Sequence, residues 1–376
     1  FKQVSWDEAF QFIADKLKHI ADEWGPEAVA LTCHHDPNTV FYHHLLKDLY
    51  GSPNMYAHTS GCEQDRRSAC LTLFGHVFPM HDFVNSKYVM LWGMNNLGAN
   101  QGLWESRDLI EAQSKGCRLV VVDPNFTETA QKADEWVPIR PGTDGSMALA
   151  MCRVIIDEKL YDEEFVTKYC EGFTGFRDHL YEKGYTPAWA EEICGIEAET
   201  IARLAREFAT TKPAMSAIFK GSGYYTNGHD AARACYILDA ICGEVDKPGN
   251  IHLKDWAPLG APVEIPEGAI HTPEKDPLHV AMGYPLAPDL PNSKLPDAVI
   301  NGDPYPIKGL FVHSTNPVMS DPNKERVLEM FKHLELAVSC ELYLSETSLE
   351  CDIVLPETSF HEQAEIRQGM WLGPEV

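Results

Sequence analysis

Hydrophobic and polar positions alternate along this chain in two patterns, one typical of helices and one of buried strands. The segment SWDEAFQFIADKLKHIADEWG has apolar residues at helical spacing from Phe10 to Ile20. Ser5 and Glu8 precede them at the spacing of a capping box, which marks the start of a helix. Continuous apolar runs are typical of strands buried in a parallel sheet. They predict strands at 28–33, 86–93, 117–123, 135–139, 213–219, 307–314, 334–340 and 351–357.

Helices are predicted between these strands, where apolar positions recur every three or four residues. They cover 38–50, 63–74, 103–115, 144–158, 162–170, 187–193, 197–210, 229–243 and 322–333. Because strands and helices alternate, we expect an α/β fold with parallel sheets. Residues 247–307, rich in proline and glycine and without a sustained period, predict a long irregular excursion. The βα units on either side of it predict two doubly wound, Rossmann-like domains, and no internal repeat is apparent.

Composition narrows the choice of partners. The 376 residues are enough for about two domains, and the net charge of −25 argues against nucleic acid and anionic membranes. It is compatible with one bound nucleotide, because local backbone donors outweigh the average field. No apolar run reaches the ~18 residues of a membrane span, and no signal peptide is recognisable. Because the chain opens at FKQVSWDEAF without Met, we interpret it as a piece of a longer protein, whose compartment stays open.

The eleven cysteines are scattered, and none has the spacing of a zinc site. Most lie among apolar neighbours, which predicts buried free thiols in a reducing or anaerobic environment. Cys62 differs, because it follows a turn and a loop, YAHTSGC, and precedes the helix predicted from residue 63. A helix N-terminus stabilises a thiolate, which is a nucleophile or a soft metal ligand. Spacing alone favours a structural thiol at Cys62, and Cys70 is expected in the core.

Polar residues at the ends of the predicted strands are the candidates for a ligand site, since ligands of open α/β sheets bind there. The loop WGMNNLGANQG (92–102) lacks the G-x-G-x-x-G pattern, which argues against a nicotinamide-dependent dehydrogenase. Its glycines and asparagines suit an anion at a helix N-terminus or an ordinary tight turn. Asp123 is placed to bind ribose hydroxyls. Asp144 is either a helix cap or a carboxylate that accepts guanine N1–H and N2–H₂.

The same layout recurs in the last third, where HSTNPVMSDP (313–322) follows a strand. There CELYLSETSLECDIVLPE places Glu341, Thr347 and Asp352 around strand ends. The sequence therefore suggests one nucleotide site in each half.

Taken together, the ordered segments of the chain resemble the molybdenum and tungsten bis-pterin enzymes of the dimethyl sulfoxide reductase family. The segments that carry the resemblance are VSWDEAF, GSPNMYAHTSGC, YVMLWGMNN, RLVVVDPNFTETAQKADEWVPIRPGTDGSMALAM, EFVTKYCEGF, PAWAEEICGIEAETIARLAREFA, DAICGEVDKPG, FVHSTNPVMSDP and ELYLSETSLECDIVLPETSF. They run from end to end except for the excursion, and the block from RLVVVD to RPGTD is the most specific of them.

The resemblance implies the two middle α/β domains of a four-domain enzyme. Each of these domains holds one arm of a bis-molybdopterin guanine dinucleotide cofactor. The first domain is discontinuous, matching 1–58 and 308–376, and the second matches 59–250, with 251–307 as the excursion at their junction. The family's 4Fe-4S cluster belongs to an amino-terminal segment that this sequence does not contain. Its closing carboxyl-terminal domain is also expected outside it.

The resemblance also assigns site residues. Cys62 matches the protein ligand of the metal, Mo or W, which turns the structural interpretation of this thiol into a ligand hypothesis. One nucleotide arm is implied at Trp92, Gly93, Asn95, Asp123, Thr127, Pro141, Gly142 and Asp144, with Gly221 and Gly223 nearby. The other arm is implied at Ser314, Asn316, Pro317, Glu341, Thr347 and Asp352.

The implied activity is oxo transfer or two-electron chemistry on a small-molecule substrate. An iron–sulfur electron-transfer subunit is the implied partner, with no nucleic acid and no direct membrane insertion. Glu63 replaces the histidine of formate dehydrogenases, and PGNIHLKDWAP departs from their R-G-Q-N-N-like stretch, which argues against formate. The pattern favours thiosulfate, polysulfide or arsenate reductases. Hydratase or hydroxylase-type members and cofactor-free structural relatives are the alternatives, and Cys62 with RPGTD argues against the last.

Overall fold

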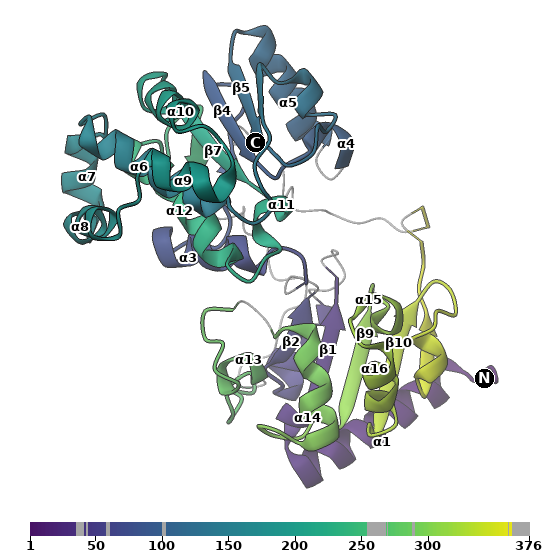
Figure 1. Ribbon diagram of the computed structural model, residues 1–376. Coiled ribbons are helices and arrows are strands. Elements are labelled where there is room, and N and C mark those ends of the chain that lie inside the picture. Colours follow the sequence, from purple (N-terminus) through teal and green to yellow (C-terminus); the bar gives the residue numbers. More distant parts are fainter. Residues whose placement is uncertain are drawn as a thin grey trace. The chain divides into compact units, whose positions relative to one another are not determined.

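A computed structural model describes residues 1–34, 41–42, 44–57, 61–99, 103–253, 268, 270–287, 290–359 and 361–362. The chain forms two compact units, and the first is discontinuous in sequence. It joins Phe1–Cys62 to Ala257–Gln368, and the segment Glu63–Trp256 makes up the second. Each unit contains a parallel sheet, which confirms the predicted α/β class (Figure 1).

The first unit has a five-stranded parallel sheet in the order β11-β10-β9-β1-β2. Its strands are β1 (Val29–Cys33), β2 (Asn54–Ala57), β9 (Gly309–His313), β10 (Leu336–Glu341) and β11 (Ile353–Pro356). Its helices are α1 (Trp6–Trp24), η1 (Pro26–Ala28), the π-helix η2 (His44–Tyr50), α13 (Leu278–Ala281), η5 (Asn292–Lys294), α14 (Leu295–Asn301), α15 (Pro317–Ser320), α16 (Lys324–Phe331) and η6 (Ser348–Glu350).

Helices cover both faces of this sheet, and the strand residues alternate between them. Phe311 points to the face where Ile13 and Ile20 of α1 pack. Its neighbours Leu310 and Val312 belong to the opposite core, with α14 and α16 (Figure 1). The α1 helix begins with the expected capping box, in which the Ser5 hydroxyl accepts from the Glu8 N–H and the Glu8 carboxylate from the Ser5 N–H.

The second unit has a four-stranded parallel sheet in the order β6-β5-β4-β7. Its strands are β3 (Met80–His81), β4 (Tyr88–Trp92), β5 (Arg118–Val122), β6 (Glu135–Val137), β7 (Ala214–Ile218) and β8 (Ile251–His252), of which β3 and β8 pair separately. Its helices are α3 (Gln64–Phe74), α4 (Asn96–Ala99), α5 (Leu103–Ser114), η4 (Ala130–Lys132), α6 (Asp144–Asp157), α7 (Glu163–Tyr169), α8 (Phe173–Lys183), α9 (Pro187–Cys194), α10 (Ala198–Thr210), α11 (Lys220–Gly223) and α12 (Gly228–Cys242).

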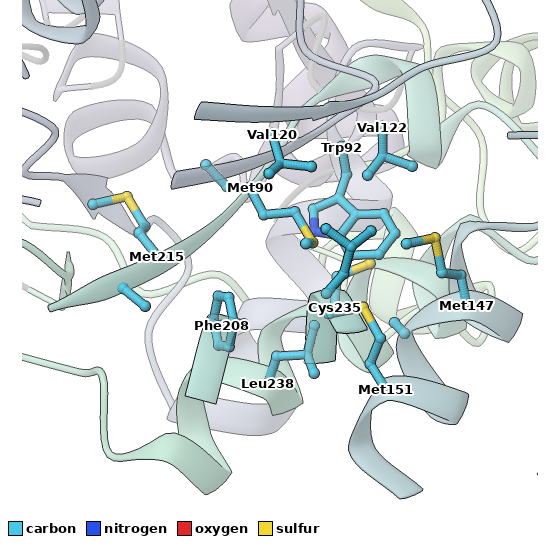
Figure 2. Close-up of a cluster of buried hydrophobic side chains, with 14 of the residues drawn as sticks. Met90, Trp92, Val120, Val122, Met147, Met151, Phe208, Met215, Cys235 and Leu238 are labelled. Atoms are coloured by element: carbon cyan, nitrogen blue, oxygen red, sulfur yellow. The ribbon is translucent and has the colours of Figure 1, made fainter. Parts of the chain in front are cut away.

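The core of the second unit lies between this sheet and its helices. Figure 2 shows Met90 and Trp92 of β4 beside Val120 and Val122 of β5, facing side chains from α6, α10 and α12. Trp92 is fully buried, and its Nε1–H donates to the Ser216 hydroxyl at 2.9 Å. The continuous apolar pattern of both strands follows from burial on both faces.

The structure differs from the predicted elements at three places. Residues 54–57, expected in a turn and loop, form β2, where the Tyr56 hydroxyl donates to Asn54 Oδ1. Four residues are too few to show a strand period. The helix predicted at 38–50 is described only in part, and its last seven residues form a π-helix. No helix was predicted for 173–183, which forms α8.

The excursion is less irregular than its composition suggests. Its residues 254–267, 269 and 288–289 lie outside the described part of the chain, but α14 forms within it. Leu295 and Val299 of this helix and Ile307 beyond it are buried in the core of the first unit. Prolines and glycines on both sides concealed this short apolar helix, because their composition dominates any sequence window.

The cysteines behave as the sequence predicts. Ten of the eleven are buried. Burial raises the pKa of the Cys70 thiol to about 12, which keeps it protonated and agrees with a core position. Among helices in the described part of the chain, none combines the length and the apolar character that a membrane crossing needs.

Candidate cofactor sites

The carboxyl edge of the second unit's sheet is built around two glycines in contact. Gly93 follows β4 at φ +55°, and its carbonyl accepts the Gly221 N–H at 3.0 Å. A Cβ on Gly93 would lie 2.5 Å from the Ser222 nitrogen, and one on Gly221 would lie 2.6 Å from Gly93 Cα. Since backbone atoms cannot move aside, only glycine fits either position. The turns after β4 and β7 therefore pack backbone to backbone.

Two buried carboxyl groups lie at the same edge. Asp123 follows β5, and Asp144 begins α6; they are 7% and 4% exposed. One oxygen of Asp123 accepts the Asn125 N–H at 2.8 Å. Burial, together with the charge of Asp123, raises the pKa of Asp144 to about 6. A carboxylate kept from water in this way is stabilised by any ligand that offers it N–H donors.

We expect Asp144→Asn to flatten the dependence of stability on pH. The pKa of Asp144 rises from 3.8 to about 6 on folding, so the wild type loses stability as pH rises through this interval and stays at the lower level above it. At pH 7 the variant is expected to gain up to about 3 kcal/mol in the free energy of unfolding, and near pH 3 almost nothing. Urea titrations at several pH values measure this. An unchanged pH profile would refute the buried ionisation.

A loop and an aromatic ring border these carboxyl groups. Gly142 has φ +75°, and its carbonyl accepts Asn227 Nδ2–H at 3.0 Å. A Cβ there would lie 3.1 Å from the Tyr225 ring. Gly223 leaves room for Asp65, whose Oδ2 would lie 1.5 Å from a Cβ at that position. That buried Oδ2 has no hydrogen-bond partner among the described residues, so it is available to a ligand.

A polar clasp, defined as Asn95, Glu128, Thr129 and the N–H of Leu97, joins the loops after β4 and β5. Asn95 Oδ1 accepts from the Thr129 hydroxyl at 2.8 Å and from the Thr129 N–H at 3.2 Å. The Leu97 N–H donates to the same hydroxyl at 3.0 Å. Asn95 Nδ2–H donates to Glu128 at 2.8 Å. Each polar atom of the Asn95 and Thr129 side chains thus has a partner.

The first unit contains the same clasp between the loops after β9 and β10. Asn316 Oδ1 accepts from the Thr347 hydroxyl at 2.7 Å and from the Thr347 N–H at 3.3 Å. The Val318 N–H donates to that hydroxyl at 3.1 Å, and Asn316 Nδ2–H donates to Glu346 at 2.9 Å. Ser314, two residues before Asn316, has φ +53°, as Gly93 does before Asn95. The expectation of no internal repeat is therefore wrong.

The carboxyl edge of the first unit also holds residues that the sequence did not single out. His313 is fully buried, and its Nε2 lies 3.0 Å from a carboxylate oxygen of Glu357. Glu341, which was predicted, accepts the Leu342 N–H at 2.8 Å. Pro317 is the first residue of α15 and is buried. These residues come from the ends of three neighbouring strands, β9, β10 and β11.

Two predicted site residues, Trp92 and Asp352, do not reach a ligand edge with their side chains. Trp92 points into the core, because its indole fills the space between sheet and helices (Figure 2). Asp352 lies at the amino end of β10, where it accepts the Ala337 N–H at 2.8 Å. Asp134 does the same for the Leu119 N–H in the second unit. Thr127 accepts the Ala130 N–H and so closes a turn.

A repeated short motif is the signal for the clasp residues that the sequence analysis did not name, which are Glu128, Thr129 and Glu346. TETAQKAD in the second unit and SETSLECD in the first align Thr129 with Thr347 and Asp134 with Asp352. The two copies differ in nearly every apolar position, so they share geometry more than sequence.

Cys62 precedes Glu63, the N-cap of α3, and is buried. The Glu63 carboxylate makes ion pairs with Arg66 and with Arg67, the latter at 2.6 Å. Burial raises the pKa of Glu63, but the two arginines outweigh it and leave that pKa below its ordinary value. Arg66 also packs between the rings of Phe78 and Phe219. The start of α3 is thus fixed by a buried charge network, while His58, Thr59 and Ser60 lie outside the described residues.

Comparison with known proteins gives matches along nearly the whole chain. A family model described as "Molybdopterin oxidoreductase" matches residues 1–370. The chain is 31% identical to the thiosulfate reductase molybdopterin-containing subunit PhsA of Salmonella typhimurium, over 96% of the chain and 49% of that protein. It is 27% identical to the arsenate respiratory reductase molybdopterin-containing subunit ArrA of a Shewanella species, over 95% of the chain and 46% of that protein.

Among solved structures, acetylene hydratase from Pelobacter acetylenicus aligns with a TM-score of 0.78 and 25% identity. The alignment covers 99% of this chain and 55% of that one. The chain thus spans about half the length of the relatives that it matches.

Proposed function

Because the chain belongs to the molybdopterin oxidoreductase family, we propose that it forms the cofactor-binding core of a catalytic subunit that holds a bis-molybdopterin guanine dinucleotide. The family implies a molybdopterin cofactor with Mo or W. The relatives are molybdopterin-dependent oxidoreductases, so the chain is part of an enzyme. The guanine dinucleotide form, with one arm at each sheet, is the specific part of this proposal.

The residues at both carboxyl edges fit such a cofactor. In the second unit, the contact of Gly93 with Gly221 leaves backbone rather than side chains at the edge, which suits a diphosphate. Asp144 is a buried carboxyl group with a raised pKa. Hydrogen bonds from the N–H donors of a guanine base would stabilise its ionised form. Asp123 is suited to ribose hydroxyls. In the first unit, Ser314, Asn316, Pro317 and Glu341 would hold the second arm.

The observation that carries the proposal is the repeated clasp at the two carboxyl edges. One nucleotide site needs one such edge, and this chain has two with the same construction. A cofactor with two nucleotide arms is the ligand class that uses both. A nicotinamide-dependent dehydrogenase would use one, and its glycine fingerprint is absent from the sequence at 92–102.

Cys62 is proposed as the protein ligand of the metal. A thiolate is the soft donor that suits Mo or W among dithiolene sulfurs. Within the described residues, no group of three or more His, Cys, Asp and Glu side chains could hold a metal ion by itself. That agrees with a cofactor that brings most of the donor atoms. When bound, the metal supplies oxo transfer or two-electron chemistry, and the chain holds and orients the cofactor.

A small sulfur or arsenic oxyanion is the proposed substrate class. Two relatives are named as thiosulfate and arsenate reductase subunits. A hydratase-type activity is the second candidate, because the aligned structure is an acetylene hydratase. We further propose an iron–sulfur electron-transfer subunit as the partner and a 4Fe-4S cluster within the complete enzyme, since a reductase must receive its electrons.

Steady-state assays of the complete enzyme test this proposal. A panel of thiosulfate, tetrathionate, polysulfide, arsenate and acetylene is assayed with a reduced viologen dye. Dye oxidation with a sulfur or arsenic substrate supports the reductase. Acetylene consumption without dye oxidation supports the hydratase. Absence of Mo and W from active enzyme would refute the family chemistry.

A further inference from the structure

The polar clasp is more than a loop contact, because it occurs at the same place in two units. In each unit it joins the loop after one strand to the loop after the neighbouring strand, behind a residue with left-handed φ, Gly93 or Ser314. We propose that Thr129 and Thr347 are positioning residues. Each fixes the shape of the loop that faces one nucleotide diphosphate arm. This inference rests on the proposed function, adds Thr129 to it, and gives a positioning role to Thr347, which the resemblance places at the second arm.

The threonine hydroxyl is the centre of each clasp. Thr129 and Thr347 are both fully buried, and each hydroxyl donates once and accepts once. Because threonine is branched at Cβ, its χ1 is restricted, which fixes the direction of both bonds. Valine has the same shape and would remove both bonds. Serine would keep them.

The glutamates set the orientation of the asparagine amides. Glu128 and Glu346 accept Nδ2–H, which leaves each Oδ1 to its threonine. The hydrogen bond from the asparagine lowers the pKa of both glutamates, so both are ionised at neutral pH. Both carboxylates lie in solvent, where water and salt screen their charge from a nearby diphosphate. Their role is therefore orientation rather than contact with the ligand.

A different pair of residues, Asp134 and Asp352, connects neighbouring strands. Asp134 and Asp352 accept the N–H of Leu119 and Ala337 at 2.7 and 2.8 Å, at the amino ends of β5 and β10. This pair is duplicated as well, but it lies at the edge away from the candidate sites. Each unit thus has an aspartate that connects two strands at the amino edge and a polar clasp that shapes the loops at the carboxyl edge. The two devices can be removed separately.

Titration of the purified 376-residue chain with GDP tests the inference by isothermal calorimetry. The wild type is expected to bind two GDP per chain. In Thr129→Val we expect affinity at one site to fall about 10-fold, because losing two buried hydrogen bonds loosens the loop. Thr347→Val is expected to weaken the other site, and Thr129→Ser to restore wild-type binding. The two valine substitutions lie in separate units. If one variant misfolds, GDP binding by the other variant still tests the inference.

Asp134→Asn is the matched control, because it weakens the contact between β5 and the start of β6 at the opposite edge of the sheet. It is expected to lower the melting temperature and to leave both GDP affinities unchanged. The inference is overturned if both valine variants bind GDP like the wild type, or if Asp134→Asn weakens GDP as much as they do. Failure of the wild type to bind GDP at all would remove the proposed nucleotide sites as well as their positioning residues.

Discussion

Replacing Cys62 with alanine in the complete enzyme is expected to abolish turnover and to remove one sulfur from the coordination shell of the metal. Cys62 immediately precedes Glu63, the N-cap of α3, and so lies at the junction of the loop and the helix. Cys70 lies inside the same helix, fully buried, and burial raises the pKa of its thiol to about 12. It therefore stays a protonated core residue. X-ray absorption at the metal edge counts the sulfur ligands.

Cys70→Ala is the matched control for that experiment. It is expected to leave the sulfur count and turnover unchanged and to cost about 1 kcal/mol in stability for one lost sulfur-sized group. A Cys62→Ala enzyme with the full sulfur count would show that Cys62 is not the ligand. Loss of a sulfur in the Cys70 variant would assign the ligand to the helix interior instead.

Arg66→Met is expected to cost the chain about 3–5 kcal/mol in the free energy of unfolding, the typical effect of leaving one half of a buried ion pair. The Arg66 side chain is only 2% exposed and neutralises the buried Glu63, whose side chain is 9% exposed and which has Arg67 as its second cation. Two aromatic rings, Phe78 and Phe219, also lose their cation contact. Urea denaturation followed by circular dichroism measures the loss.

The double variant Glu63→Leu with Arg66→Met separates the charge effect from packing. Because it removes the Glu63–Arg66 pair together and leaves only the more exposed Arg67 without its partner, it is expected to recover part of the stability lost in the single variant. If the double variant is as unstable as Arg66→Met, then packing of the arginine stem dominates. An Arg66→Met chain within 1 kcal/mol of the wild type, on the order of a surface substitution, would contradict the buried network altogether.

The buried strands were predictable because parallel strands covered on both faces leave a continuous apolar signal. The runs around Val120 and Phe311 became β5 and β9. Strand β2 could not be found in this way, because it spans only Asn54–Ala57 and carries polar residues within the core. Asn54 is fully buried, and its amide is satisfied by the Glu27 carbonyl at 2.7 Å.

The ends of the predicted strands gave the positions of many candidate site residues, but they did not show in which direction the side chains point. Asp123 directly follows β5, Glu341 is the last residue of β10, and both lie at the carboxyl edge. Asp352 precedes a strand, so it lies at the amino end, and Trp92 is the last residue of its strand with its indole turned inward. A polar residue near a strand end therefore lies at the carboxyl edge only if it follows the strand, and at the amino edge if it precedes it.

The clasps escaped notice because their parts are far apart in sequence. Asn95 and Thr129 are 34 positions apart, and Asn316 and Thr347 are 31 apart. Only the fold brings them together, since neighbouring parallel strands end at the same edge. The repeated Glu-Thr pairs at 128–129 and 346–347 were visible, but nothing in a single sequence ties them to an asparagine one strand away.

Hydrolysis of the proposed cofactor, which carries two guanine nucleotide arms and one metal, tests the proposed function most directly. The complete enzyme is purified, the metal is quantified by mass spectrometry, and acid-released nucleotides are separated and counted. The account predicts one Mo or W and two GMP per chain. One GMP per metal, another nucleotide in its place, or a metal-free protein with no releasable nucleotide would contradict it.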